Sequence, residues 1–209
     1  LRDGDKSRYN GLGVLKAVEN VETIIAPKII GMDAKNQREI DELMISLDAT
    51  ENKANLGANA ILSVSMAIAR AEAISEKKPL YEYLSKFNPD FSGTYQMPIP
   101  MMNIMNGGKH ANWATDIQEY MIFPVGAKNI TEAVRICAEV YANLKKTIKS
   151  HGYGIGVGDE GGFAPNVSSN DEPFQLMKEA IEISGYKLAD DIVFCIDAAA
   201  TEFFKDGKY

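Results

Sequence analysis

Apolar positions recur with a helical period in the first part of the chain. Between Gln37 and Leu47 they fall at i, i+3, i+4 and i+7, the stripe of an amphipathic helix: Ile40, Leu43, Met44 and Leu47. A second helix is predicted after Gly57, with one apolar face made of Ile61, Val64, Ile68 and Ala71. Its many alanines indicate close contact between helices. We therefore predict one compact unit over residues 1–85, which opens with turn signals around short extended pieces in residues 1–13.

The pattern changes after residues 86–97, which are rich in turn formers and form the predicted linker. Apolar strands are predicted over residues 98–104, 118–125 and 192–197. Helices are predicted after Asn129, which has Glu132 three residues later as a capping signal, and after Asp171. Strands that alternate with helices indicate an α/β unit over residues 98–209, with a mainly parallel sheet whose strands are buried on both faces.

Composition and charge exclude several classes of protein. The 209 residues are 45% hydrophobic and 24% charged, as in ordinary globular proteins, and no long apolar run predicts a membrane span. The net charge of −7 argues against nucleic-acid binding, which needs clustered Lys and Arg. Cys137 and Cys195 lie in apolar settings outside any CxxC pair, which indicates buried, reduced thiols in a cytosolic protein. Both ends of the chain look cut.

A glycine-rich loop from Gly152 to Asn166 contains the pattern GxGxxG at Gly156–Gly161. In a dinucleotide site, this pattern brings glycine backbone and a helix N-terminus close to a pyrophosphate. Here Asp159 and Glu160 would put negative charge where the phosphates belong, and Pro165 falls where the helix should run. We therefore reject the dinucleotide interpretation.

Two alternatives remain for the paired Asp159 and Glu160. A carboxyl group that projects from a glycine wall into a cavity can serve as a general acid, because burial or neighbouring charge moves its pKa towards neutrality. A solvated acidic turn is the plainer alternative, and the spacing alone favours it.

Four further residues carry candidate chemistry at or near the predicted strand ends. Asp197 ends an apolar strand, where it is either an oxygen ligand for Mg²⁺ or a helix cap or salt-bridge partner. His110 lies in a loop that leaves a strand. Gln118 and Glu119 open the next strand with side chains on opposite faces. Each signal is weak alone.

Taken together, these segments closely resemble the enolase family over essentially the whole chain. Similar to family motifs are Asn106-Gly-Gly-Lys-His110-Ala, Gln118-Glu119-Tyr-Met-Ile, Gly158-Asp-Glu-Gly-Gly-Phe-Ala-Pro-Asn166, and Ile196-Asp197 with Glu202-Phe-Phe. The segment GDEGG is highly specific. Arg2-Asp-Gly-Asp5, Glu51-Asn-Lys53 and Leu56–Leu62 resemble the N-terminal domain of the family.

The resemblance implies an α/β barrel of the enolase type, incomplete here, preceded by a small α+β N-terminal domain. It implies reversible dehydration of 2-phosphoglycerate to phosphoenolpyruvate in glycolysis by a carbon–oxygen lyase with two Mg²⁺ per site. Glu160 would be the catalytic acid; Glu119 and His110 would be catalytic and bind substrate; Gln118 would bind substrate; Asp197 would be a metal ligand. A cytoplasmic homodimer or higher homo-oligomer is also implied, although family members also occur at the cell surface or secreted.

The chain departs from the family pattern in two ways. It has Ala49 where the family usually has Gly, and Leu12 where the family has Lys. The resemblance also implies a serine loop before Leu1, and a lysine base, two more metal carboxylates and phosphate-binding residues beyond Tyr209. We therefore expect residues 1–209 alone to be inactive. Two alternatives remain. The chain could be a non-catalytic binding module, which the complete reading frame would test by showing whether the lysine and two further carboxylates follow. It could also be a relative that acts on another acid, which the segment GDEGGFAPN disfavours.

Overall fold

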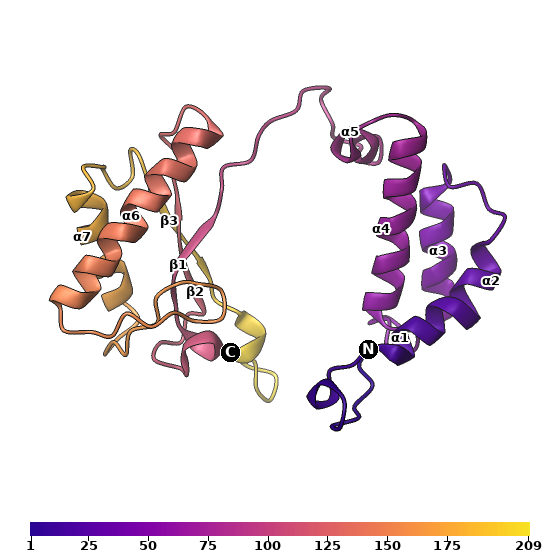
Figure 1. Cartoon of the computed structure of the whole chain (residues 1–209), viewed down its shortest axis with the longest axis horizontal. Helices are drawn as coiled ribbons and strands as arrows, with labels where there is room; N and C mark the ends of the chain where they lie inside the picture. The colour runs from indigo at the N-terminus through magenta and orange to yellow at the C-terminus, as the bar shows by residue number, and fades with distance from the viewer. The chain divides into compact units, whose positions relative to one another are not determined.

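The computed structural model describes every residue of the chain except the side chain of His110. The chain divides into two compact units, Leu1–Thr94 and Tyr95–Tyr209, which are drawn in Figure 1. Among the described residues, no helix combines the length and apolar character needed to cross a bilayer.

All the regular secondary structure of unit 1 is helical. They are α1 (Leu15–Asn20), which continues through the π-helical turn η2 (Val21–Ile25) into α2 (Ala26–Ile29), then α3 (Gln37–Asp48), α4 (Ala58–Ser75) and α5 (Leu80–Ser85). The predicted stripe of α3 is confirmed, since Ile40 and Met44 are buried against Ile61 of α4 in one cluster. The predicted face of α4 is confirmed in part, because Val64 and Ile68 pack against the same cluster but Ala71 is exposed. Periodicity did not reveal α1, α2 or α5.

The expected β content of the N-terminal domain is wrong for the described residues of unit 1, which contain no strand. Residues 1–13 close on themselves through two backbone hydrogen bonds, from Asp3 N to Gly13 O (2.8 Å) and from Gly4 N to Gly11 O (3.1 Å). The 3₁₀ turn η1 (Tyr9–Gly11) lies between them. Two bonds around a turn form a closed loop and no extended ladder, so these turn signals do not produce a sheet.

Unit 2 combines a sheet with two long helices. Its strands are β1 (Met102–Asn106), β2 (Glu119–Phe123) and β3 (Val193–Asp197), and its helices are α6 (Ile130–Ser150) and α7 (Glu172–Ile183). Short 3₁₀ turns follow two of the strands, η3 (Gly108–Ala111) and η4 (Ala200–Glu202). The predicted cap of α6 is confirmed, because Asn129 Oδ1 accepts a hydrogen bond from Glu132 N at 2.9 Å. The side chain of Asp171 makes no such capping bond to α7.

The prediction of a mainly parallel sheet is wrong for the described strands. The order is β1-β2-β3, and β2 is antiparallel to both neighbours. Only a 3₁₀ turn joins β1 to β2, and two helices rather than one join β2 to β3. One helix between two strands brings the chain back to the starting end of the sheet, so that the next strand is parallel. A second helix reverses the chain once more, so that β3 runs antiparallel to β2. The three strands do not establish a closed barrel.

Helices α6 and α7 cover one face of the sheet. The core of unit 2 joins Met105, Tyr120 and Ile122 of the sheet to residues of both helices, among them Val140, Leu144, Met177 and Ile181. Figure 1 shows these helices on the same side of the strands. The strands are therefore not covered equally on both faces, and Asp197 at the end of β3 is exposed.

Candidate active site

The sheet face opposite α6 and α7 carries two of the predicted site residues, Glu119 and Asp197. Asn106 of β1, Glu119 of β2 and Asp197 of β3 are successive Cα partners across the three strands. Side chains of directly paired residues share one face of a sheet. The predicted catalytic residue Glu119 and the predicted metal ligand Asp197 therefore lie in one row, and we name the face that carries this row the site face.

A β-bulge adds a further polar residue to the site face. The register of β1 shifts between Asn103 and Met105, so that Asn103 pairs with Met121 while Asn106 pairs with Glu119. Met121 and Glu119 are two residues apart in β2 and therefore share a face. Without the bulge, two asparagines three residues apart would point to opposite faces. The bulge thus places both Asn103 and Asn106 on the site face.

Residues 156–164 form a hairpin with Asp159 and Glu160 at its tip. Gly158 N donates to Gly162 O at 2.8 Å, and Ala164 N donates to Gly156 O at 2.9 Å. No helix follows Gly161, because the chain pairs back through Phe163. This geometry agrees with the rejection of a dinucleotide site, which requires a helix at that point.

The hairpin is anchored between β1 and α6. Phe163 is buried. Its backbone N donates to Ile104 O at 2.9 Å, and its backbone O accepts from Asn106 N at 2.8 Å. On the other side, the Phe163 ring stacks on Tyr141 of α6 at 4.5 Å between centroids, and the Tyr141 hydroxyl donates to Gly161 O at 2.7 Å. Burial raises the pKa of Tyr141 above its ordinary value, so the hydroxyl keeps its donor proton. These contacts fix the base of the hairpin while its tip is exposed.

Asn103 connects the hairpin tip to the site face. Its Nδ2 donates a hydrogen bond to Glu160 Oε2 at 3.0 Å. The Oδ1 of Asn103 and both amide atoms of Asn106 are buried and have no hydrogen-bond partner among the described residues. A buried polar group without a partner costs free energy, so such a cluster marks a site where another polar group binds. We identify both asparagines as site residues, although neither was predicted to have a role in the site and only Asn106 lies in a family motif.

The start of β2 is held by backbone bonds on both sides. Gln118 N donates to Asp197 O at 3.1 Å, and Gly107 N donates to Gln118 O at 2.9 Å. A Cβ on Gly107 would lie 1.7 Å from Thr115 Oγ1, so only glycine permits this close approach. The segment therefore fixes Gln118 beside the ends of β1 and β3.

The predicted residues are thus partly brought together. Glu119 and Asp197 are paired, Gln118 adjoins them, and Glu160 is joined to β1 through Asn103. The predicted role of His110 lies outside the described residues. Asp197 Oδ1 accepts a hydrogen bond from Ala199 N at 2.8 Å, which orients its carboxylate. No three described His, Cys, Asp or Glu side chains gather closely enough to hold a metal ion.

Comparison with known families covers both units. Residues 1–84 match the family model described as "Enolase, N-terminal domain". Residues 94–209 match the model described as "Enolase, C-terminal TIM barrel domain", which alone accounts for more than half of the chain.

Proposed function

Because the chain belongs to the enolase family, we propose that it supplies part of a Mg²⁺-dependent carbon–oxygen lyase active site for 2-phosphoglycerate. The reaction is the reversible loss of water that gives phosphoenolpyruvate in glycolysis. The observation that carries this proposal is the shared site face, where Glu119 and Asp197 are paired and Asn103 bonds to Glu160.

Glu160 is the proposed acid that protonates the departing 3-hydroxyl group. Loss of water from 2-phosphoglycerate breaks a carbon–oxygen bond, and hydroxide is a poor leaving group unless a proton reaches it. The hydrogen bond from Asn103 Nδ2 to Glu160 Oε2 supports this role, because it restricts the orientation of the carboxyl group. A fixed acid loses less entropy in the transition state than a mobile one.

Glu119, Gln118 and His110 are the proposed substrate contacts, with Glu119 and His110 also acting in catalysis. The position of Glu119 in the row with Asp197 supports a role beside the bound metal. Gln118 is supported by its backbone bonds to Asp197 of β3 and to Gly107, which directly follows β1, because these bonds fix its Cα. For His110 the support is the motif alone.

Asp197 is the proposed ligand for the first Mg²⁺. Mg²⁺ is usually bound through one or two carboxylates, with water completing the octahedron, and the oriented, exposed carboxylate of Asp197 fits that donor type. When bound, Mg²⁺ offsets the negative charge that develops on the substrate carboxylate as the adjacent carbon loses its proton. Two Mg²⁺ per site and a cytoplasmic homodimer or larger homo-oligomer are part of the same proposal and rest on the family alone.

The test compares turnover of 2-phosphoglycerate with Mg²⁺ by the product of the complete reading frame and by residues 1–209 alone. We expect turnover only by the former, and we expect Glu160→Gln to reduce it by roughly a hundredfold or more, as for loss of a general acid. Glu182→Gln, an exposed change on α7, is the matched control. Full activity of the Glu160→Gln variant would reject Glu160 as the acid, and turnover by residues 1–209 would show that the base is within them.

A further inference from the structure

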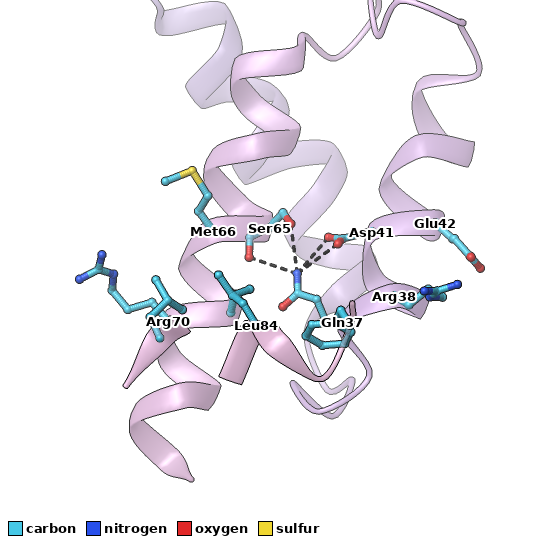
Figure 2. Close-up of a pocket in the computed structure, with 11 residues that line it drawn as sticks. Gln37, Arg38, Asp41, Glu42, Ser65, Met66, Arg70 and Leu84 are labelled. Carbon is cyan, nitrogen blue, oxygen red and sulfur yellow. Dashed lines mark hydrogen bonds between the residues drawn. The ribbon is translucent and has the colours of Figure 1, made fainter. Parts of the chain in front are cut away.

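A second concave site lies within unit 1, independent of the sheet. A cleft of about 440 Å³ opens between α3, α4 and α5 (Figure 2), within the size range of small-molecule pockets. Its apolar walls come from α4, α5 and the residue that follows α5: Met66, Ala69, Leu80, Leu84 and Phe87. Among the polar side chains that line the same cleft, that of Gln37 at the start of α3 is more than nine-tenths buried.

The hydrogen bonds of Gln37 fix the orientation of its amide. Nε2 lies 3.1 Å from Asp41 Oδ1, 3.1 Å from Ser65 O and 3.1 Å from Ser65 Oγ. The carboxylate and the backbone carbonyl are acceptors only, so they require the NH₂ group on their side. A flipped amide would place its oxygen against both of them. Figure 2 shows the resulting arrangement, with the Gln37 nitrogen towards Asp41 and Ser65.

The amide oxygen is therefore left on the other side without a partner. Gln37 Oε1 is buried and accepts no hydrogen bond from any described residue. In Figure 2 it points away from Asp41, towards the side on which Leu84 lies. An acceptor that is both shielded from water and unpaired gains more from a donated hydrogen bond than an exposed one does.

Charge at the cleft restricts the chemistry of a ligand. Two cationic and two anionic side chains line it, Arg38, Arg70, Asp41 and Glu42, so their charges cancel. A neutral molecule avoids the cost of transferring a charge onto apolar walls. The thioether of Met66 and the ring of Phe87 are groups on which aromatic rings pack favourably.

We propose that this cleft binds a small neutral aromatic molecule that carries one N–H or O–H donor, and that the donor bonds to Gln37 Oε1. The aromatic ring lies against the apolar walls, and the side chain of Leu84 moves to admit it. This site is separate from the proposed lyase chemistry and does not depend on it.

The test uses two matched probes, indole and 1-methylindole, which share a ring system and differ in the N–H donor. Binding to the 209-residue chain is followed by ¹H–¹⁵N chemical-shift titration. We expect saturable shifts at residues of α3, α4 and α5, with indole binding roughly fivefold to tenfold more tightly than 1-methylindole, as one hydrogen bond would give.

A variant locates the preference at Gln37. In Gln37→Met, which keeps the length of the side chain and removes the acceptor, we expect the two probes to bind equally. Gln175→Met on α7 is the control and should keep the preference for indole. Equal binding of the two probes to the unchanged chain, or shifts confined to other residues, would overturn the proposal, and this comparison needs no variant to fold.

Discussion

Asp48 illustrates how a single buried carboxylate organises a loop. Its side chain is fully buried, and it accepts hydrogen bonds from Leu56 N at 2.6 Å and from the backbone and hydroxyl of Thr50. Burial acts to raise the pKa of Asp48, but the hydrogen bonds from Thr50 and Leu56 together outweigh it, so the pKa lies below its usual range. The ionised form therefore holds the α3–α4 connection.

This pKa predicts how the stability of unit 1 depends on pH. Because the pKa of Asp48 is lower in the folded than in the unfolded chain, its contribution is present above the unfolded value of about 4 and is lost as the pH falls through the folded pKa. We expect Asp48→Asn to destabilise the chain at pH 7 and to flatten its stability between pH 5 and pH 2, measured as urea midpoints. Asp33→Asn, at an exposed aspartate, should leave the profile unchanged. A variant as acid-sensitive as the original chain would contradict this role.

Residue patterns predicted some of the site and missed the rest for a structural reason. Glu119 and Asp197 could be assigned to strand ends because apolar runs begin or end at them. Asn103 lies within the strand predicted over residues 98–104, and Asn106 opens the motif that contains His110. Their common face, however, depends on a bulge that follows from pairing with β2, and a regular period of two assigns them to opposite faces.

At the scale of elements, the C-terminus of α3 shows the effect of a departure from the family sequence. Ala49, where the family usually has Gly, is the C-cap residue and has a left-handed backbone with φ +59°. A Cβ in this region contacts the following carbonyl group, and glycine avoids that contact.

We therefore expect Ala49→Gly to stabilise unit 1 by about 1 kcal/mol, in denaturant unfolding at neutral pH. Ala54→Gly is the matched control, because Ala54 in the same connection lacks a positive φ. The control should be neutral or destabilising, since there glycine only adds freedom to the unfolded chain. Equal effects of the two changes would rule out relief of backbone strain.

The contact between the hairpin and β1 also depends on a glycine, Gly162. A Cβ on Gly162 would lie 2.5 Å from Asn106 Oδ1 and 3.0 Å from Met105 N. The hairpin must move away from β1 to accommodate any side chain, because one of these atoms is backbone. The position of Glu160 relative to Asn103 therefore depends on the absence of a side chain two residues later.

We expect Gly162→Ala to destabilise unit 2 by about 1–3 kcal/mol, the usual cost of overpacking. Gly154→Ala is the control, since its Cβ would meet nothing within 4 Å. Urea unfolding gives the stability, and the side-chain amide signals of Asn103 report its bond to Glu160. Unchanged stability and unchanged amide signals in Gly162→Ala would show that the hairpin does not pack closely on β1.

At the scale of the whole molecule, local period predicted helices better than it predicted strand direction. The predicted stripe of α3, and that of α4 apart from the exposed Ala71, lie on faces that pack into the core, because a helix period is a local property. The direction of a strand depends on the number of helices that precede it, and this produced the error in the sheet. The short helices α1, α2 and α5 are too brief to show a period.

The predicted division of the chain into residues 1–85, a linker at 86–97 and residues 98–209 remains to be tested in solution. Residues 92–101 form no helix or strand, and Met97, Ile99 and Met101 are exposed there. Thermolysin cleaves before exposed apolar residues in extended backbone, because a regular helix does not fit its active site. Its first cuts at low concentration should therefore fall within residues 92–101, giving two fragments seen by mass spectrometry.

Each fragment carries its own apolar core, so each should keep its helical circular dichroism after separation. Earlier cleavage inside α4 or α6, or loss of helicity in both fragments, would mean that the chain is not built from two independently folded units.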